Sequence, residues 1–161
     1  TDALSLKRSS MAFRSYLTLF CQLDSEELDV AGKHLLEGYD CLEHTQFLCA
    51  DAMNLPDDLG QFDFVHAANL ICRLPDPAQL LKRLPGLVVT GGYLVLATPC
   101  TWLNEFTPPE NQPSDDTFKW LSDLLSPSFQ LIKKADEPFL IRETARKFQW
   151  SVSMITLWQR V

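Results

Sequence analysis

Polar side chains suited to binding a ligand follow several short apolar segments of the sequence. Asp24 ends one such segment, Asp51 follows a second, and Asn69 comes soon after the apolar residues at positions 62–65. Each also has a simpler structural interpretation, because Asp and Asn favour helix caps and turns. Asp24 could cap the helix that follows it, and Asp51 and Asn69 could be turn residues. Their value as binding groups therefore depends on the elements that position them.

A proline-rich loop at residues 100–113 carries a second set of candidates, which are Trp102, Glu105 and Phe106. The two aromatic side chains either plug the core beneath the loop or form a lid over an aromatic substrate. Farther along, the charged residues between 142 and 147 most simply form a solvated turn. Arg142 has the alternative role of a clamp for a carboxylate, since a guanidinium can pair with both carboxylate oxygens at once.

The histidines and cysteines show no metal-binding pattern. His66 ends an apolar segment, which is typical of a core histidine rather than of a catalytic base. The cysteines form neither a CxxC pair nor the Cys/His spacing of a zinc site. We therefore expect no metal, and buried, reduced thiols in an intracellular compartment, either cytoplasmic or organellar. The residues concerned are His34, His44, His66, Cys21, Cys41, Cys49, Cys72 and Cys100.

The length and composition are those of one globular domain. The 161 residues suffice for a single domain with a real core, which we expect to span residues 1–161. A net charge of -7 argues against a nucleic-acid partner. No apolar run reaches the roughly 20 residues that span a bilayer. The sequence begins without methionine, so we expect a piece of a longer protein, with a preceding domain or other protein subunits as partners.

A strand–helix–strand unit occupies the middle of the chain. Apolar residues at 62–65 and 93–97 predict two strands. Between them, Asp76 is expected to cap a helix whose first residue is Pro77, and Gly86 is expected to end it. Leucines spaced along the helix give it an apolar face, and they are Leu80, Leu81 and Leu84. This pattern is typical of a βαβ unit.

The βαβ unit indicates where chemistry is to be sought. A helical crossover of this length joins parallel, right-handed neighbours, and near-continuous apolar strands suit a sheet covered on both faces. In such sheets ligands bind beyond the carboxyl ends of the strands. Residues 67–70 and 98–102 are therefore the first places to expect a binding site.

The remainder of the chain alternates strands and helices and then ends in a hairpin. We expect helices at residues 11–17, at 26–36, and after a Ser114 cap, and strands at residues 3–6, 19–23, 46–49, 129–132 and 148–158. Residues 138–141 either extend the strand before them or form a separate edge piece. The apolar pattern of the last strand predicts that it lies inside the sheet with both faces covered. The expected fold is α/β, mostly parallel, with an antiparallel C-terminal hairpin.

Several strings of residues resemble one known family. They are WLNEFTP at 102–108, IRETARKFQ at 141–149, and the shorter groups around Asn69 and Asp76. This combination is similar to the 4-mercaptohistidine N1-methyltransferase family, the methyltransferase domain of ovothiol biosynthesis. The likeness covers nearly the whole chain and is stronger after Thr45. It implies a Rossmann-like class I methyltransferase sheet that binds S-adenosylmethionine and transfers its methyl group to an imidazole nitrogen of a small, amino-acid-like mercaptohistidine substrate.

The resemblance also implies roles for particular residues. Asp24 would hold the ribose hydroxyls of the cofactor, and Asp51 with Ala52 would meet its adenine. Asn69 would lie where the sulfonium and the substrate come together, as a cofactor-binding and catalytic residue. Glu105, the second catalytic candidate, is the carboxylate nearest in sequence to Trp102 and Phe106, and it could accept either the ammonium or the imidazole N–H of a histidine-like substrate. The expected substrate-binding residues are Trp102, Phe106 and Arg142.

The chain departs from this family at its cofactor loop. Class I methyltransferases place a glycine-rich loop after the first strand, because glycine lets the backbone approach the cofactor closely. Here Leu6 is followed directly by residues 7–10, which include no glycine. If the full protein keeps the loop, the chain is an enzyme domain. If the gene has lost it, the chain is a pseudoenzyme, an inactive structural or interaction subunit of a larger assembly.

Overall fold

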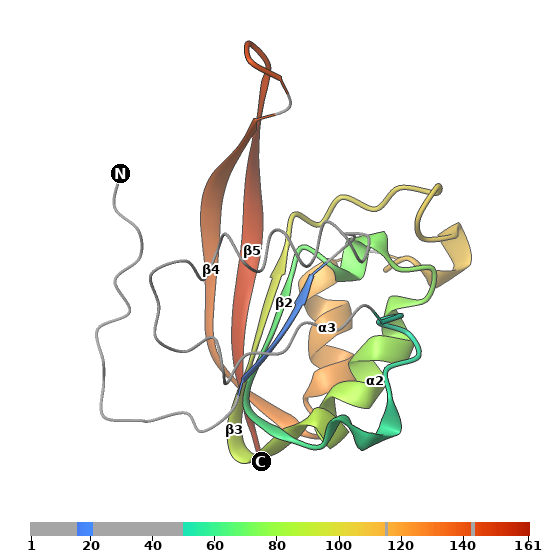
Figure 1. Cartoon of the computed structure of the whole chain (residues 1–161), viewed down its shortest axis with the longest axis vertical. Helices are drawn as coiled ribbons and strands as arrows, with labels where there is room; N and C mark the ends of the chain where they lie inside the picture. The colour runs from blue at the N-terminus through green and yellow to red at the C-terminus, as the bar shows by residue number, and fades with distance from the viewer. Residues whose placement is uncertain (1–15, 21–49, 115, 143) are drawn as a thin grey trace.

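The computed structural model describes residues 16–20, 50–114, 116–142 and 144–161 (Figure 1). Its strands form one sheet in the order β1-β2-β3-β5-β4. Strands β1, β2 and β3 are parallel, whereas β5 runs antiparallel to both β3 and β4. The expected α/β sheet with an antiparallel C-terminal hairpin is thus confirmed. The strands are β1 (Tyr16–Phe20), β2 (Phe62–Ala68), β3 (Val88–Thr98), β4 (Phe129–Arg142) and β5 (Phe148–Arg160).

Helix α2 (Pro77–Leu87) joins β2 to β3 and confirms the βαβ unit. Asp76 is its N-cap, and its Oδ1 atom accepts a hydrogen bond of 3.1 Å from the backbone N–H of Ala78. The expected end at Gly86 is wrong by one residue. The helix includes Gly86 and stops at Leu87, because Val88 already has extended backbone angles and begins β3.

Strand β3 begins at Val88, five residues before the expected start at residue 93. Its early part is separated from the apolar run by an irregularity in the strand. Its pairing with β2 shifts register between Val88 and Tyr93. Gly91 has a φ of 80°, in the region that favours glycine. At Gly92 an added Cβ would lie 2.9 Å from the carbonyl oxygen of Asp63 on β2. The two glycines therefore allow the two strands to approach closely at the bulge.

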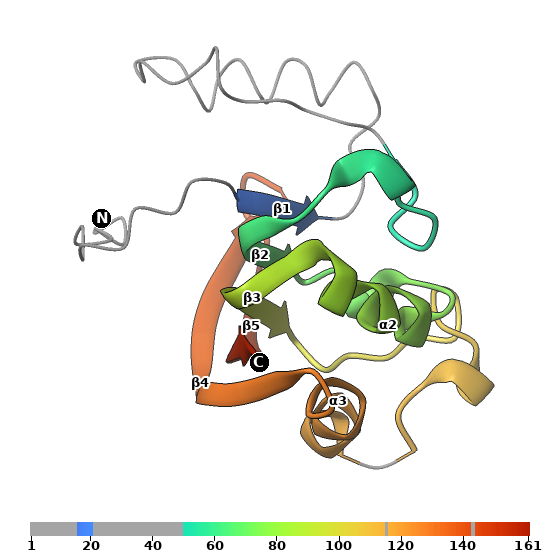
Figure 2. The same ribbon diagram turned by 90° about the horizontal axis from the view of Figure 1, so that it is seen from below.

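Helices α2 and α3 (Thr117–Leu125) lie on the same face of the sheet (Figure 2). The hydrophobic core lies between that face and the helices, and its largest buried side chains include Val65, Leu80, Leu84, Leu94, Leu96, Leu121, Leu125, Phe129 and Trp158. The expected Ser114 cap of α3 is wrong. Asp116 is the N-cap, and its carboxylate accepts hydrogen bonds from the backbone N–H groups of Phe118 and Lys119 at 2.7 and 3.4 Å.

The C-terminal hairpin extends past the other strands (Figure 1). Strand β4 is continuous from Phe129 to Arg142, so residues 138–141 extend it. The expectation that β5 is covered on both faces along its length is wrong. Trp150 is 67% exposed, and burial begins only at Ser153. The reason is that β3 ends at Thr98, which pairs with Met154. Among the described strands, the earlier half of β5 therefore pairs with β4 alone.

At the start of the described chain the expectation was partly wrong. Tyr16 and Leu17 belong to β1 rather than to the end of a helix, and β1 starts before residue 19. The other expected elements before residue 50 lie outside the described residues, as does the segment of the expected cofactor loop. Short 3₁₀ turns complete the structure, and they are η2 (Asp57–Leu59), η3 (Ile71–Arg73) and η4 (Pro109–Asn111).

His66 lies in β2 on the sheet face opposite the core, and its burial lowers its pKa from the ordinary value. The unfolded chain therefore binds a proton there more readily than the folded chain, so this histidine lowers stability as the pH falls through its unfolded pKa of about 6.5. We expect a larger loss of unfolding free energy between about pH 7.5 and pH 5.5 for the native chain than for His66→Gln. Urea unfolding at both pH values measures this, and equal losses would contradict it.

Candidate functional site

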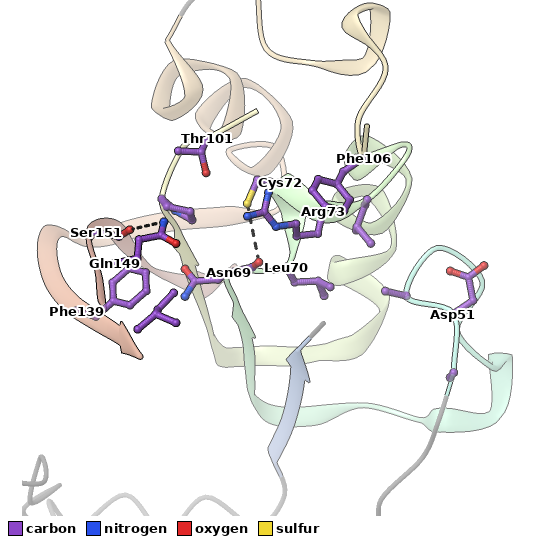
Figure 3. Close-up of a pocket in the computed structure, with 15 residues that line it drawn as sticks. Asp51, Asn69, Leu70, Cys72, Arg73, Thr101, Phe106, Phe139, Gln149 and Ser151 are labelled. Atoms are coloured by element: carbon purple, nitrogen blue, oxygen red, sulfur yellow. Dashed lines mark hydrogen bonds between the residues drawn. The ribbon is translucent and has the colours of Figure 1, made fainter. Parts of the chain in front are cut away.

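A cavity of about 590 Å³ opens at the carboxyl ends of β2 and β3 (Figure 3). Its lining comes from the loop at residues 50–52, from the segment that follows β2, from the loop after β3, and from the inner face of the β4–β5 hairpin. Both segments expected from the βαβ unit contribute to it, residues 67–70 through Asn69 and Leu70, and residues 98–102 through Pro99 and Thr101.

Asn69 is the first residue after β2 and lines the cavity. Its φ of 51° turns the chain sharply out of the strand, and Asn tolerates this conformation better than most residues. Its backbone N–H donates a 2.8 Å hydrogen bond to the carbonyl oxygen of Ala97. The Ser153 hydroxyl donates one of 2.8 Å to the side-chain Oδ1 atom. These contacts orient the side chain so that its NH₂ group is the part available to a ligand.

Asp51 and Ala52 line the cavity from a separate loop, on the side away from Asn69 (Figure 3). Asp51 does form the turn that was its simpler interpretation, because its Oδ1 atom accepts a 2.9 Å hydrogen bond from the backbone N–H of Met53. Its carbonyl oxygen also accepts from Asn54 N–H at 2.9 Å. The second carboxylate oxygen of this exposed residue accepts no hydrogen bond from the described residues and can accept one from a ligand.

Arg73 is a cavity residue that the sequence patterns did not single out. It ends η3, and its guanidinium carbon lies 4.6 Å from the ring centre of Phe106, one of the expected substrate-binding residues. Its Nη1 atom is buried and has no hydrogen-bond partner among the described residues. The signal available in the sequence was its position, shortly after the carboxyl end of β2 and inside the segment that resembles the family.

The β4–β5 hairpin supplies a wall of the cavity that the sequence patterns also missed. Phe139 and Ile141 of β4 and Gln149 and Ser151 of β5 line it. Gln149 donates a 3.2 Å hydrogen bond from its Nε2 atom to the Ser151 hydroxyl. Because side chains alternate along a strand, these residues share one face, and the alternation at residues 148–158 contained this information.

Three other expected site residues lie away from the cavity lining. Trp102 donates a 3.0 Å hydrogen bond to the Thr117 hydroxyl and packs edge-on against Trp120 at 5.9 Å between ring centres, which favours its interpretation as a plug. Glu105 is exposed. Arg142, exposed at the hairpin end, donates from Nε to the Thr144 carbonyl oxygen at 3.2 Å, which favours the solvated turn.

The remaining expected functional residue, Asp24, lies outside the described residues. Among the described residues, no cluster of His, Cys, Asp and Glu could hold a metal ion, and no helix is long and apolar enough to cross a membrane. Neither Cys72 nor Cys100 forms a disulfide in the described part of the chain. Cys72 is buried in the cavity wall, and Cys100 is an exposed residue. Partial burial of the Cys100 thiol raises its pKa.

Several solved structures with the same fold are described as methyltransferases. A SAM-dependent methyltransferase from Methanosarcina mazei is 18% identical, with a TM-score of 0.59 over 91% of this chain and 82% of that chain. A SAM-dependent methyltransferase and possible histamine N-methyltransferase from Thermotoga maritima is 14% identical, with a TM-score of 0.56 over 93% and 83%. The 4+2 cyclase SpnF is 13% identical, with a TM-score of 0.62 over 95% and 78%.

These identities are low, so the structural likeness establishes the class I methyltransferase fold and leaves the reaction open. The cyclase among the matched structures illustrates that point. No curated protein matches the sequence at a significant level. The sequence does match the model of a methyltransferase-domain family over residues 22–151, which is most of the chain. The chain therefore belongs to this methyltransferase-domain family.

Proposed function

We propose that the chain binds S-adenosylmethionine in the cavity at the carboxyl ends of β2 and β3 and transfers a methyl group to an imidazole nitrogen of a mercaptohistidine-type substrate. The observation that carries this proposal is the placement of Asn69, which lines a cavity of about 590 Å³ together with Asp51 and Ala52. Cavities of roughly 300–1,000 Å³ are typical of small-molecule and cofactor sites.

The described residues fit the cofactor. Asp51 offers a free carboxylate oxygen to an exocyclic amine such as that of adenine, and Ala52 offers backbone and a small side chain beside it. Asn69 offers an oriented amide N–H at the point where the chain leaves β2. The ribose role of Asp24 belongs to the same proposal and rests on the resemblance alone. When bound, the cofactor supplies a methyl group on a positively charged sulfur, which is already a good leaving group.

The chain's own task in such a transfer is to hold the reacting groups in line. A neutral imidazole nitrogen is nucleophilic near pH 7, so a strong general base is not required. Catalysis then comes mainly from fixing the nitrogen close to the methyl carbon and opposite the sulfur. Asn69 is suited to this because its backbone and side chain are both anchored, to Ala97 and to Ser153.

The identity of the acceptor rests on three supports. The sequence strings at residues 102–108 and 141–149 resemble the mercaptohistidine family, and the second string forms the end of the hairpin that walls the cavity. Phe106 and Phe139 line the cavity and suit a flat aromatic ring. The Thermotoga maritima structure is described as a possible histamine N-methyltransferase, and histamine contains an imidazole ring.

Incubation with S-adenosylmethionine and 4-mercaptohistidine, followed by mass spectrometry, tests the proposal. We expect one methyl group on an imidazole nitrogen of the product, and much slower reaction with an acceptor that lacks the imidazole. A chain that binds the cofactor but methylates only thiols or oxygens would overturn the acceptor. A chain that binds no cofactor would overturn the reaction itself.

One observation favours a second function, that of an inactive interaction subunit. The outer face of the hairpin exposes large apolar side chains, with Leu140, Phe148 and Trp150 at 57%, 52% and 67% exposure. Apolar patches of this kind are typical of surfaces that contact another protein. A preceding domain or another subunit would then be the partner. Failure to bind the cofactor, together with a stable complex, would favour this function over methyl transfer.

A further inference from the structure

Arg73 brings a positive charge into the cavity, and no described residue forms a salt bridge with it. Its side chain extends from η3 toward Cys72 and Asn69 (Figure 3). In the described part of the chain it makes no salt bridge, and its buried Nη1 atom has no hydrogen-bond partner. A buried donor without a partner costs about 1–3 kcal/mol, and more when it is charged. A ligand that accepts hydrogen bonds would remove this cost.

The guanidinium is also held in place before any ligand arrives. Its carbon atom lies 4.6 Å from the centre of the Phe106 ring, a cation–π arrangement. The neighbouring Thr107 hydroxyl donates a 2.7 Å hydrogen bond to the carbonyl oxygen of Leu74, the residue after Arg73. Phe106 and Thr107, in the loop after β3, thus contact Arg73 and the residue that follows it. A fixed fork of N–H groups loses little entropy when it pairs with a planar anion.

The rest of the cavity lining does not compete for this charge. Asp51 is the one carboxylate among the described lining residues, and it sits on the separate loop at residues 50–52, with one oxygen already bonded to Met53. Arg73 is the one Lys or Arg among those lining residues. The charge of the cavity therefore favours a ligand that carries an anion near η3.

We infer that Arg73 binds the α-carboxylate of an amino-acid ligand through paired N–H···O hydrogen bonds. This rests on the proposed function, in which the acceptor and the methionine part of the cofactor both carry such a carboxylate. Arg pairs with carboxylates in a bidentate geometry that Lys cannot reproduce. Arg73 thus takes the role that the sequence suggested for Arg142, whose guanidinium lies at the exposed hairpin end.

Calorimetric titration of the native chain, Arg73→Met and Arg73→Lys tests the assignment with three probes. The probes are S-adenosylhomocysteine, 4-mercaptohistidine, and the amine that corresponds to mercaptohistidine without its carboxylate. Arg83→Met is the matched control, because Arg83 lies on α2, outside the cavity lining, and makes only a 3.6 Å pair with Asp57. A charge-assisted pair corresponds to a roughly 10- to 100-fold change in affinity.

If the acceptor carries the carboxylate, the native chain binds mercaptohistidine at least about 10-fold more tightly than the amine, and Arg73→Met binds the two equally. If the cofactor carries the carboxylate, Arg73→Met instead binds S-adenosylhomocysteine at least about 10-fold more weakly than the native chain does. Either result supports the assignment, with Arg73→Lys intermediate and Arg83→Met unchanged. A native chain that binds these probes with the same affinities as Arg73→Met overturns the inference and leaves methyl transfer intact. A native chain that binds none of them overturns both.

Thermal unfolding of the ligand-free chains separates binding from a structural role. Since the guanidinium is a partly buried charge with no salt bridge to any described residue, Arg73→Met is expected to unfold at the same temperature as the native chain or higher. A clear loss of stability in Arg73→Met without ligand would mean that Arg73 serves the fold, and would contradict its role as a carboxylate-binding residue.

Discussion

Asn69→Gly is expected to lower the rate of methyl transfer by about 100-fold or more while the chain keeps its fold. Glycine adopts the φ of 51° at this position without strain, so the turn out of β2 is preserved. The substitution removes only the side-chain amide that Ser153 orients beside the cavity. If Asn69 aligns the reacting groups, kcat falls by this large factor while the free energy of unfolding changes little.

Asn69→Ala is the companion variant. It removes the same amide but also places a Cβ on a left-handed residue, which costs roughly 1–2 kcal/mol of stability. We therefore expect equal losses of kcat in the two variants and lower stability in Asn69→Ala alone, measured by steady-state kinetics and urea unfolding. Normal turnover by Asn69→Gly would show that the side chain has no part in the reaction.

Trp158→Ala is expected to lower the free energy of unfolding by about 3–5 kcal/mol, the largest stability effect in the described core. Trp158 is 1% exposed and packs on β5 among residues of the sheet and both helices. Its removal leaves a cavity that a close-packed core cannot refill. Urea unfolding of both chains measures the difference, and a loss below about 1 kcal/mol would mean that the core is not packed around this side chain.

Two further tryptophan substitutions make this test specific. In the part of the chain that the structure describes, the buried Nε1 atom of Trp158 has no hydrogen-bond partner, so Trp158→Phe removes an unpaired donor together with some volume. Its stability loss should therefore be much smaller than that of Trp158→Ala. Trp150, which is 67% exposed on the same strand, is the matched surface control, and Trp150→Ala should change stability by less than about 0.5 kcal/mol.

The central βαβ unit could be predicted because its signals are local. Asp76 and Pro77 fix the start of α2 through capping and backbone geometry, and the leucine spacing fixes which face is buried. The rule that ligands bind at the carboxyl edge then predicted a binding site at residues 67–70 and 98–102, and both segments line the cavity. These inferences needed only neighbours within a few residues and one general rule of sheet topology.

The parts that failed depend on contacts between distant segments. The burial of β5 changes at Ser153 because β3 ends at its partner residue Thr98, and no pattern within β5 states where another strand stops. Arg73 carries no motif of its own, and its importance comes from Phe106, which is far along the chain and lies against it in space. Trp102 was ambiguous until its partners Thr117 and Trp120 were known.

The most direct test of the account is a calorimetric titration of the native chain with S-adenosylhomocysteine. The proposed cofactor site is the cavity that Asp51, Ala52 and Asn69 line. We expect one molecule bound per chain with a dissociation constant in the micromolar range, and weaker binding to Asn69→Gly. No heat of binding at millimolar ligand would contradict the account, and the chain would then be a methyltransferase fold without its cofactor.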